Sequence, residues 1–547
     1  MGDDVSMKKT LRLVALSLVV ALSATMMASC GKSPSDGGSS TTGTATGAPD
    51  DGSPITIRLS AAANFEFDAA SDALAKKIEN DFGITFENVG YEGDIEKMML
   101  DAQSKELADI VYTEPLYDLY SLTSFIDQGF FRPIPEEMLE QFPNVKKSLE
   151  ASVVCQTVKQ NFGGYYLLPK PDSLDPTLYI GERKGIFYRK DWLKKVGIDK
   201  EPSTWEELYE MCKAFTTQDP DGNGKNDTYG MTSDGFGNFR YFMANIGHSN
   251  LNWVKGPDGK WTHGALLEDN IEALKWFRKM FEEGYIDPEI GSNKWEQAMQ
   301  KFASEKFGAV NRNTDADWLK KIIVDQFYAA TSDKYENPFD VVGVIPTFAK
   351  DANSKPGIDK YIDTMCATQI AATCTDEKLQ RYLKFYEYLL TEEGNLLQLG
   401  LEGVDWKKDN DGKITMIKGA DGLLPEVSSK YKCLSAACMQ SWGFDLRSNP
   451  DIETFTIFND EIKTLDKNLR DKRNANVIES DMRIKLMSEQ SLLDANMFKF
   501  SVEYCNIVTG KEPVDVMFKD MVSRAMASGF DVAIEDVNKI ADEKGWK

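Results

Sequence analysis

A β-α-β-α-β rhythm near the start of the folded part of the chain constrains the fold most strongly. Apolar alternation predicts strands over 55–59, 84–89 and 110–112, and helical spacing predicts helices over 69–81 and 95–105 between them. Strands that are joined through helices run parallel, so this order predicts an α/β fold with helices covering a parallel sheet. Ligands of such open sheets bind beyond the carboxyl ends of the strands.

The length of the chain predicts more than one lobe. Of its 547 residues, nearly five hundred follow the polar segment 31–54, and one hydrophobic core rarely supports so many. The glycine- and proline-rich stretch 163–185 predicts a crossing between lobes, and a strand pattern at 362–372 predicts a return to the first. We therefore expect discontinuous lobes joined by hinge segments. Their predicted bounds are 55–170 with 360–405 for lobe 1, and 171–359 with 406–547 for lobe 2.

The N-terminal sequence is typical of an exported lipoprotein. Basic residues precede an apolar run over 13–28, and small residues lead directly into Cys30. This cysteine resembles that of a bacterial lipobox, in which the thiol is acylated, for instance with palmitate. We expect residues 1–30 to be a lipoprotein signal peptide with lipidated Cys30, and residues 31–54 to be a flexible tether. The acidic residues before Met7 leave both Met1 and Met7 open as the start. The body is expected at the extracytoplasmic face of the cell membrane.

Charge and cysteine content exclude several classes of protein. Lys and Arg number 63 against 87 Asp and Glu, which gives a net charge of -24. Such acidity disfavours nucleic acid and anionic membrane surfaces as partners. Eight cysteines are too few for a disulfide scaffold in a chain of this length, although pairing of Cys433 with Cys438 remains open.

The acidic loop 219–227 has the spacing of a calcium-binding loop. Side-chain oxygens stand at its first, third, fifth and ninth positions, a backbone carbonyl at the seventh, and a glycine at the sixth. Gly230 occupies the twelfth position instead of the usual glutamate, so the EF-hand pattern is incomplete. A turn without an ion is the alternative, because Pro, Asp, Asn and Gly all favour turns. The predicted ligands of a structural Ca²⁺ are Asp219, Asp221, Asn223, Lys225 and Asp227.

The order of these motifs resembles the extracellular solute-binding proteins of family 1, especially the long lipoprotein members that feed carbohydrate ABC transporters. The block from Arg189-Lys190-Asp191-Trp192 to Asp227-Thr228-Tyr229-Gly230 is the most specific match. The resemblance implies a periplasmic-binding-protein-like (type II) fold, whose two α/β lobes close on a solute. It also implies a monomer that passes a carbohydrate to permease subunits, and calcium in the loop. The other matching stretches are 164–169, 281–289, 390–394, 400–406 and 510–513.

Sugar binding requires aromatic faces that stack on sugar rings and planar polar groups that bind hydroxyls. Residues of both kinds follow predicted strands or lie in late connections. Core packing is the alternative for each aromatic residue, and a solvated charge or an interlobe ion pair is the alternative for Glu114 and Arg312. The predicted ligand-binding residues are Asn64, Phe65, Glu114, Tyr117, Asn311, Arg312, Trp318, Trp406 and Trp442.

The sequence disfavours an enzyme. Its only histidines are His248 and His263, and it lacks the HExxH, GxSxG, Walker A and GxGxxG motifs. We therefore expect no catalytic residues. The alternatives are a secreted glycoside hydrolase that uses two carboxylates, a binding protein for a non-sugar solute, and an adhesin, although the chain shows no fixed repeat.

Overall fold

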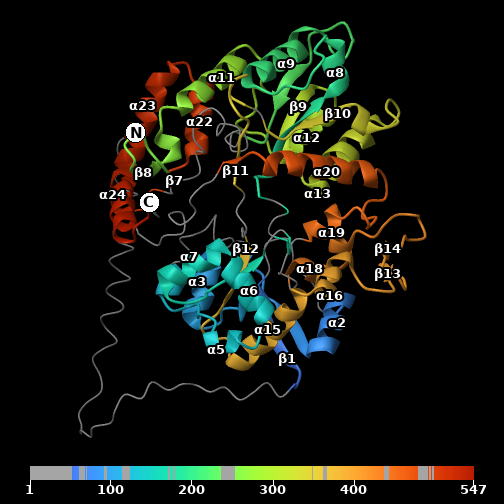
Figure 1. Ribbon diagram of the computed structural model, residues 1–547, viewed down its shortest axis with the longest axis vertical. Coiled ribbons are helices and arrows are strands. Elements are labelled where there is room, and N and C mark those ends of the chain that lie inside the picture. The colour runs from blue at the N-terminus through green and yellow to red at the C-terminus, as the bar shows by residue number, and fades with distance from the viewer. Residues whose placement is uncertain are drawn as a thin grey trace. The chain divides into compact units, whose positions relative to one another are not determined.

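The computed structural model of the protein describes most of the chain after residue 51 (Figure 1). The described residues are 52–60, 68, 70–91, 95–113, 124–170, 173–175, 178, 180–235, 253–347, 349–360, 366–436, 443–478, 491, 495 and 498–546.

The first lobe is built on a five-stranded sheet with the order β2-β1-β3-β12-β4. The strand β1 runs parallel to β2 and β3, as predicted, whereas β12 enters between β3 and β4 and is antiparallel to both. Because β12 comes from a distant part of the sequence, lobe 1 is discontinuous. The strands are β1 (Ile55–Ser60), β2 (Ile84–Asn88), β3 (Ile110–Thr113), β4 (Leu168–Lys170) and β12 (Cys366–Ile370).

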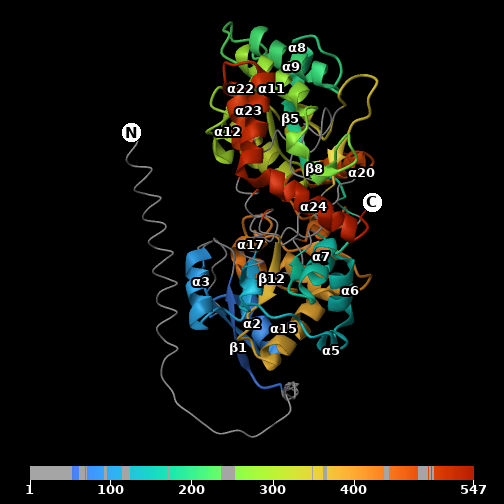
Figure 2. The same ribbon diagram turned by 90° about the vertical axis from the view of Figure 1, so that its left-hand side faces the viewer.

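Helices from both parts of the sequence cover this sheet. The long helix α15 contacts β1, α2 and α6 (Figures 1 and 2). Its apolar side chains join the core of the sheet. Arg381 on α15 is 1% exposed and donates to the carbonyls of Ser53 and Phe82, each at 3.0 Å, which ties α15 to the start of the lobe. The helices are α2 (Ala73–Phe82), α3 (Ile95–Ser104), α5 (Glu136–Leu139), α6 (Pro143–Ala151), α7 (Val153–Phe162) and α15 (Asp376–Leu389).

The second lobe contains a four-stranded sheet with the order β10-β5-β9-β6. Neighbouring residues of β5 point to opposite faces, so Ile186 enters the core that contains α9 and Phe187 enters the core that contains α12. Both faces of the sheet are therefore covered. Its elements are β5 (Lys184–Arg189), β6 (Tyr229–Thr232), β9 (Phe307–Asn313), β10 (Val342–Ile345), α8 (Lys190–Lys195), α9 (Trp205–Thr217), α12 (Trp295–Ala303) and α13 (Ala316–Leu319).

C-terminal helices complete the second lobe. The helix α11 (Asn270–Glu282) contacts α22 (Phe500–Thr509) and α23 (Val514–Ala525). The buried Arg278 on α11 donates to the carbonyls of Ile507 and Val508 at 2.9 Å, where a cation compensates the negative end of α22. The remaining elements of this lobe are the hairpin β7 (Trp253–Lys255) and β8 (Trp261–His263), and the helices α20 (Asn459–Asn474) and α24 (Asp531–Glu543).

Short pairings join segments that are far apart in the sequence. The strands β11 (Ile358–Asp359) and β15 (Val477–Ile478) run parallel, and Gly181 forms an antiparallel bridge with Lys360. The Asn474 side-chain oxygen accepts the backbone N–H of Gly181 at 3.2 Å. A Cβ at Gly181 would lie 3.0 Å from Ile358 Cγ2, so glycine permits this close approach. Segments of this kind connect the two lobes.

A fourth, small core surrounds the hairpin of β13 (Trp406–Lys408) and β14 (Ile414–Met416). It is followed by the short helices α17 (Val427–Lys430), α18 (Cys433–Ala436) and α19 (Phe444–Ser448). The Cys433 thiol donates to Asp72 Oδ1 at 3.3 Å, while Cys438 lies outside the described residues. Every helix in the described part of the chain is too short or too polar to cross a lipid bilayer.

Most predicted elements are present with small shifts in their bounds. The helix predicted from residue 69 begins at Ala73, because the Asp72 side chain accepts the backbone N–H groups of Leu74 and Ala75. The capping box predicted at Ser203 and Glu206 is one residue too early. The N-cap of α9 is Thr204, and Glu207 accepts the backbone N–H of Ser203 at 2.7 Å. Two overlapping Ser/Thr–Glu pairs compete there, and the extended Thr204 backbone decides between them.

Candidate functional site

The parallel strands β6 and β9 bring polar residues to one edge of the second sheet. Thr232 of β6 pairs with Val310 of β9, so the carboxyl ends of the two strands lie side by side. Asp234 follows β6, and Arg312 lies near the end of β9. Because ligands of α/β sheets bind beyond such strand ends, this edge is the candidate site.

Arg312 lies beside two tryptophans and a second cation. Its guanidinium carbon is 4.3 Å from the ring centre of Trp318 and 5.7 Å from that of Trp295. Lys321 Nζ lies 4.0 Å from the Trp295 ring centre and 4.7 Å from that of Trp318. The two indoles pack edge to face at 5.8 Å, and Arg312 Nη1 forms an ion pair with Asp234. We call these five residues the tryptophan–cation cluster.

A buried carboxylate positions Trp318 within the cluster. Asp315, which is fully buried, caps α13 by accepting the backbone N–H of Trp318 at 3.2 Å. Its other oxygen accepts from Arg183 Nη1 at 2.9 Å. Because both oxygens are engaged, the start of α13 is fixed relative to the sheet, and so is the indole that α13 carries.

A second buried carboxylate holds the turn after β6. Asp287 is 1% exposed and accepts from Thr232 Oγ1 and Lys301 Nζ at 2.7 Å and from Asn293 Nδ2 at 2.8 Å. The same Asn293 nitrogen donates to the Ser233 carbonyl at 3.1 Å. Burial opposes ionisation of Asp287, but hydrogen bonds from Lys301, Thr232 and Asn293 lower its pKa below the ordinary value. The turn that presents Asp234 is thereby rigid.

Several buried polar atoms near this edge have no hydrogen-bond partner among the described residues. They are Ser233 Oγ, Arg312 Nε and both amide atoms of Asn311. Asn311 is fully buried and lies next to Arg312 on β9, so the two side chains point to opposite faces of the sheet. Buried polar groups are almost always hydrogen-bonded in proteins. Ser233 Oγ and Arg312 Nε therefore have unused hydrogen-bonding capacity at this edge, whereas Asn311 faces the opposite side of the sheet from Arg312.

Lys184 adds a further cation at the end of β9. Its Nζ donates to Asn313 Oδ1 at 2.6 Å. Burial lowers the pKa of Lys184 to about 8, with the Glu182 carboxylate opposing this shift and the Arg312 charge adding to it. Lys184 and Arg312 are thus close enough to interact electrostatically.

The structure brings together only some of the predicted ligand-binding residues. Arg312 and Trp318 belong to the cluster, and Asn311 lies beside it. Trp406 is 5% exposed, donates from Nε1 to the Gly400 carbonyl at 3.0 Å and packs in the small core of the β13–β14 hairpin. The predicted residues Asn64, Phe65, Glu114, Tyr117, Trp442 and Cys30 lie outside the described residues.

Four residues at this edge were not predicted from the sequence: Asp234, Trp295, Lys321 and Lys184. Asp234 has a usable signal, because it closely follows an apolar strand in the same way as Arg312. Trp295 begins a helix and follows no strand, so its pairing with Trp318 depends on tertiary packing that the sequence does not show.

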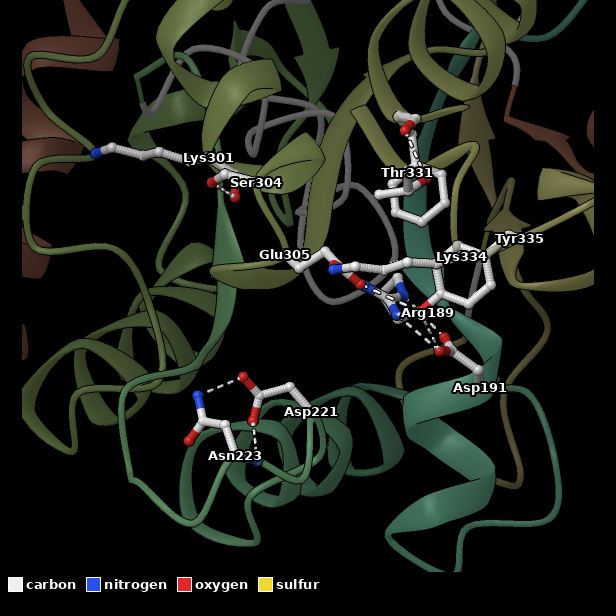
Figure 3. A network of polar contacts seen from close by, with 11 residues as sticks. Arg189, Asp191, Asp221, Asn223, Lys301, Ser304, Glu305, Thr331, Lys334 and Tyr335 are labelled. Carbon is white, nitrogen blue, oxygen red and sulfur yellow. Dashed lines mark hydrogen bonds and ion pairs between the residues drawn. The ribbon is translucent and has the colours of Figure 1, made fainter. Parts of the chain in front are cut away.

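The loop 219–227 places acidic side chains around the amide of Asn223, and Figure 3 shows Asp221 beside it. Asn223 Nδ2 donates to Asp221 Oδ2 at 2.7 Å and to Asp227 Oδ1 at 3.0 Å. Asp219 accepts the backbone N–H groups of Asn223 and Gly224, at 3.0 Å and 2.9 Å. Partial burial and the neighbouring Asp219 raise the pKa of Asp221. The loop therefore concentrates negative charge that a cation would relieve.

The donor set of this loop fits a hard cation. Carboxylate and amide oxygens are the ligands that Ca²⁺ prefers, and rotation of the Asn223 amide by half a turn would present its oxygen in place of its nitrogen. Within the part of the chain that the structure describes, however, no three His, Cys, Asp or Glu side chains converge closely enough to hold a metal ion. Binding would require the loop to contract.

The Arg189-Lys190-Asp191-Trp192 block forms a buried ion network instead of a ligand site (Figure 3). Arg189 is fully buried and donates to both Asp191 oxygens, at 2.8 Å and 2.6 Å, and to Glu305 at 2.9 Å. The Tyr335 hydroxyl accepts from Arg189 at 2.7 Å and donates to Glu305 at 3.1 Å. Lys334 pairs with Glu305 from outside. The network joins the end of β5 to the segments before β9 and β10.

Two cavities lie elsewhere among the described residues. One of about 460 Å³ is lined by residues that include Trp276, Glu272 and Lys350. The other, of about 480 Å³, is lined by residues that include Lys190 and Phe339. Neither is lined by a member of the tryptophan–cation cluster.

Comparison with known proteins agrees with this architecture. The sequence is 28% identical over 244 residues to the fructooligosaccharide ABC transporter substrate-binding protein FusA of Streptococcus pneumoniae, and this alignment covers 43% of the chain and 45% of FusA. It is 27% identical over 238 residues to the polygalacturonan/rhamnogalacturonan-binding protein YtcQ of Bacillus subtilis, covering 43% of the chain and 45% of YtcQ. The matched stretches thus span about half the length of these relatives.

Solved structures share the fold over nearly the whole chain. The structure of S. pneumoniae FusA in complex with kestose superposes with a TM-score of 0.67 at 18% identity, covering 90% of this chain and 99% of FusA. Another FusA structure is described as an EF-hand mutant. The alginate-binding protein AlgQ2, in a structure described as lacking calcium ion, superposes with a TM-score of 0.64 at 16% identity and covers 90% of this chain and 98% of AlgQ2. These likenesses confirm the predicted two-lobed α/β fold.

The family assignment follows from the sequence match. The pattern of the bacterial extracellular solute-binding proteins matches residues 61–395, which is more than half of the chain. The chain therefore belongs to the bacterial extracellular solute-binding protein family, as the resemblance in its sequence predicted.

Proposed function

We propose that the protein binds an oligosaccharide beyond the carboxyl ends of β6 and β9 and delivers it unchanged to an ABC importer. The tryptophan–cation cluster is the observation that carries this proposal. Its indoles offer apolar surface for sugar rings, and the Asp234–Arg312 pair offers planar groups that bind hydroxyls. The sugar ligands named for FusA and YtcQ support the same class of solute.

The first lobe supplies the other half of this site in our proposal. Asn64 and Phe65 after β1, and Glu114 and Tyr117 after β3, follow the carboxyl ends of parallel strands, as the cluster does in the second lobe. Trp442 remains a candidate because it is an aromatic residue in a late connection and could stack on a sugar ring. Trp406 is the weakest candidate, because the small core already surrounds it.

Attachment and delivery follow from the N-terminal sequence and the family. Acylation of Cys30 would hold the body at the outer side of the membrane on the tether 31–54, within reach of the permease subunits. We propose that the body acts as a monomer of two lobes. The predicted bounds need one adjustment, because Tyr431, Cys433 and Leu434 pack in the core of lobe 1. No catalytic residue is needed, because the importer takes the solute intact.

A calcium ion in the loop 219–227 is the structural part of the proposal. Asp219, Asp221 and Asp227 would supply charged oxygens, and Asn223 and the Lys225 carbonyl would supply neutral ones. When bound, the ion would neutralise the acidic loop and draw it together at the C-terminal end of α9. The EF-hand of FusA and the calcium-free form of AlgQ2 support this idea.

The test is a thermal-shift screen of the full chain against an oligosaccharide panel, followed by calorimetry and chromatography of the recovered ligand. Trp318→Ala is expected to weaken binding of the best ligand by at least about tenfold. Trp276→Ala, which removes a half-buried tryptophan outside the cluster, is the matched control and should leave affinity unchanged. Cleavage of the ligand during incubation would favour the glycoside hydrolase, and an absence of any sugar hit would favour a non-sugar solute.

A further inference from the structure

The charges around the tryptophan–cation cluster identify a narrower class of ligand. Three cations, Lys184, Arg312 and Lys321, lie near the end of β9, and Asp234 is the carboxylate that pairs with Arg312. The chain as a whole carries a net charge of -24. A positive patch in so acidic a protein is a local feature and does not follow from its composition.

Of the three cations, Lys321 is the one whose charge is most available to a ligand. Within the described part of the chain no carboxylate forms an ion pair with it, and its ammonium group lies against the rings of Trp295 and Trp318. Burial and then the Arg312 charge lower the pKa of Lys321. The charges of Glu296 and Asp325 oppose this shift, and neither carboxylate forms an ion pair with Lys321 among the described residues. Two half-buried cations thus lie close together, and Asp234 pairs with Arg312 alone of the two.

The hydrogen-bonding capacity of Arg312 is also incompletely used. Its Nη1 pairs with Asp234, but its buried Nε has no hydrogen-bond partner. A guanidinium presents its donors in one plane and matches a carboxylate, which accepts two parallel hydrogen bonds. Ser233 Oγ, also buried and without a partner, lies at the end of the adjacent strand.

The cations change what the two indoles can bind. A tryptophan face carries negative electrostatic potential and attracts cations. Here Arg312 and Lys321 both lie within 5.7 Å of the Trp295 ring centre, and both lie within 4.7 Å of that of Trp318. A cationic ligand would be repelled, a neutral sugar would have to compete with these contacts, and an anionic group would compensate both charges.

We propose that this site selects an acidic oligosaccharide, one whose sugar units carry carboxylates that are recognised by Arg312 and Lys321. This inference rests on the proposed function and specifies its substrate class. The sugar rings pack against the indoles, while a carboxylate lies between the guanidinium and the ammonium group. Lys184 adds to the positive potential from the neighbouring strand β5.

The test compares acidic ligands with their neutral counterparts by isothermal titration calorimetry on the full chain. Trigalacturonate and trimannuronate are measured beside their carboxyl-reduced forms, with kestose as an unrelated neutral sugar. At least one uronate is expected to bind about tenfold or more tightly than its reduced form, since hydrogen bonds to charged groups are roughly twice as strong as neutral ones. Raising the salt concentration should weaken the uronate complex several-fold.

A pair of adjacent lysine variants locates the effect. Lys321→Met keeps the length of the side chain and should reduce uronate affinity about tenfold, while changing the affinity for the reduced form by much less. Lys320→Met is the matched control, because Lys320 pairs with Asp325 and Glu426 away from the indoles.

The possible results separate this inference from the proposed function. Equal binding of a uronate and its reduced form, tighter binding of kestose, failure of all these probes to bind, or uronate affinity that Lys321→Met leaves intact would each overturn the inference. The broad oligosaccharide panel decides the proposed function independently. A neutral sugar that binds and is recovered intact would keep that function while removing the acidic substrate.

Discussion

The Arg189 network and the loop 219–227 lie close together in the sequence and arrange charge in opposite ways. In the network two cations, Arg189 and Lys334, meet two carboxylates, Asp191 and Glu305, and the arginine is fully buried. In the loop three carboxylates gather around one neutral amide, and most of its residues are exposed. A balanced buried cluster holds the fold together, whereas an unbalanced exposed one is suited to an ion.

This contrast separates two roles that the sequence presents as one motif. Both regions belong to the stretch 189–230, the most specific match to the family. From residue types alone, either the Arg189 network or the loop 219–227 could be a functional site. Burial and the number of opposing charges, which only the structure supplies, distinguish the structural network from the candidate ion site.

The largest effect is expected from Arg189→Met, which leaves Asp191 and Glu305 without their buried cation. Breaking a buried ion pair by removing one partner costs about 3–5 kcal/mol, and urea unfolding should show a loss of this size in the free energy of unfolding. Arg189→Lys should lose less, because it keeps the charge but not the fork of donors. Lys77→Met, at an exposed ion pair with Asp81, is the control and should change stability by less than about 1 kcal/mol. Similar losses in the arginine and control variants would contradict the structural role of the network.

The next effect is expected on acidification. Burial opposes ionisation of Glu305, but Lys334 and Arg189 lower its pKa below the ordinary 4.5, and the pKa of Asp287 is also lowered. Such carboxylates bind protons more weakly when folded, so their stabilising contribution is present above the unfolded pKa and lost as pH falls through the folded pKa. Stability should therefore fall below about pH 4.5.

The acid effect is measured as the midpoint of urea unfolding from pH 6 to pH 3. Glu305→Gln should be less stable at pH 6 and should show a shallower decline than the unsubstituted protein. Glu268→Gln, at an exposed position, is the control and should leave the slope unchanged. An unchanged slope in Glu305→Gln would show that this carboxylate does not contribute to acid sensitivity.

Calcium should stabilise the protein through the loop, by an amount that depends on concentration. An ion that binds the folded state alone contributes about 2–3 kcal/mol at a hundred times its dissociation constant. We expect Ca²⁺ to raise the melting temperature, a chelator to reverse the rise, and Asp221→Asn to reduce it. Asp258→Asn alters an exposed aspartate that serves an ordinary hairpin turn and should leave the calcium response intact. A calcium response that survives in Asp221→Asn would place the ion elsewhere, and no response would favour the plain turn.

The smallest effect is expected from Tyr335→Phe. This change removes one hydroxyl that accepts from Arg189 and donates to Glu305, while the ion pairs remain. A loss of about 1.5 kcal/mol is expected, at the lower end of the range of about 1.5–3 kcal/mol for hydrogen bonds to charged groups. Tyr328→Phe, a half-buried tyrosine packed against Phe458, is the control for urea unfolding. A loss no larger than in this control would show that the hydroxyl adds nothing to the ion pairs.

Local patterns predicted the elements well, and contacts between distant segments account for what they missed. The strand that became β1 and the helix that became α3 follow from apolar spacing within ten residues. The insertion of β12 between β3 and β4 joins segments about two hundred residues apart, so no local pattern reveals its neighbours. The same holds for β11 and β15.

The candidate site shows the same limit. Arg312 and Trp318 were predicted because they closely follow an apolar strand, and the structure places them in contact. Trp295 precedes that strand on another helix and meets them only through packing. Trp406 illustrates the reverse case, since an aromatic residue in a late connection turned out to be surrounded by a small core.

The entry of late segments into early cores determines when each lobe can mature. Ile186 and Val537 share one core, as do Ile57 and Leu389 in the other lobe. In a chain that emerges from its N-terminus, the core of lobe 1 therefore stays incomplete until Leu434 has appeared, and the core of lobe 2 until Val537 has appeared. Lobe 2 cannot complete its core before the last helix, α24, has appeared. Translocation of the chain as an unfolded polypeptide is therefore possible until that point.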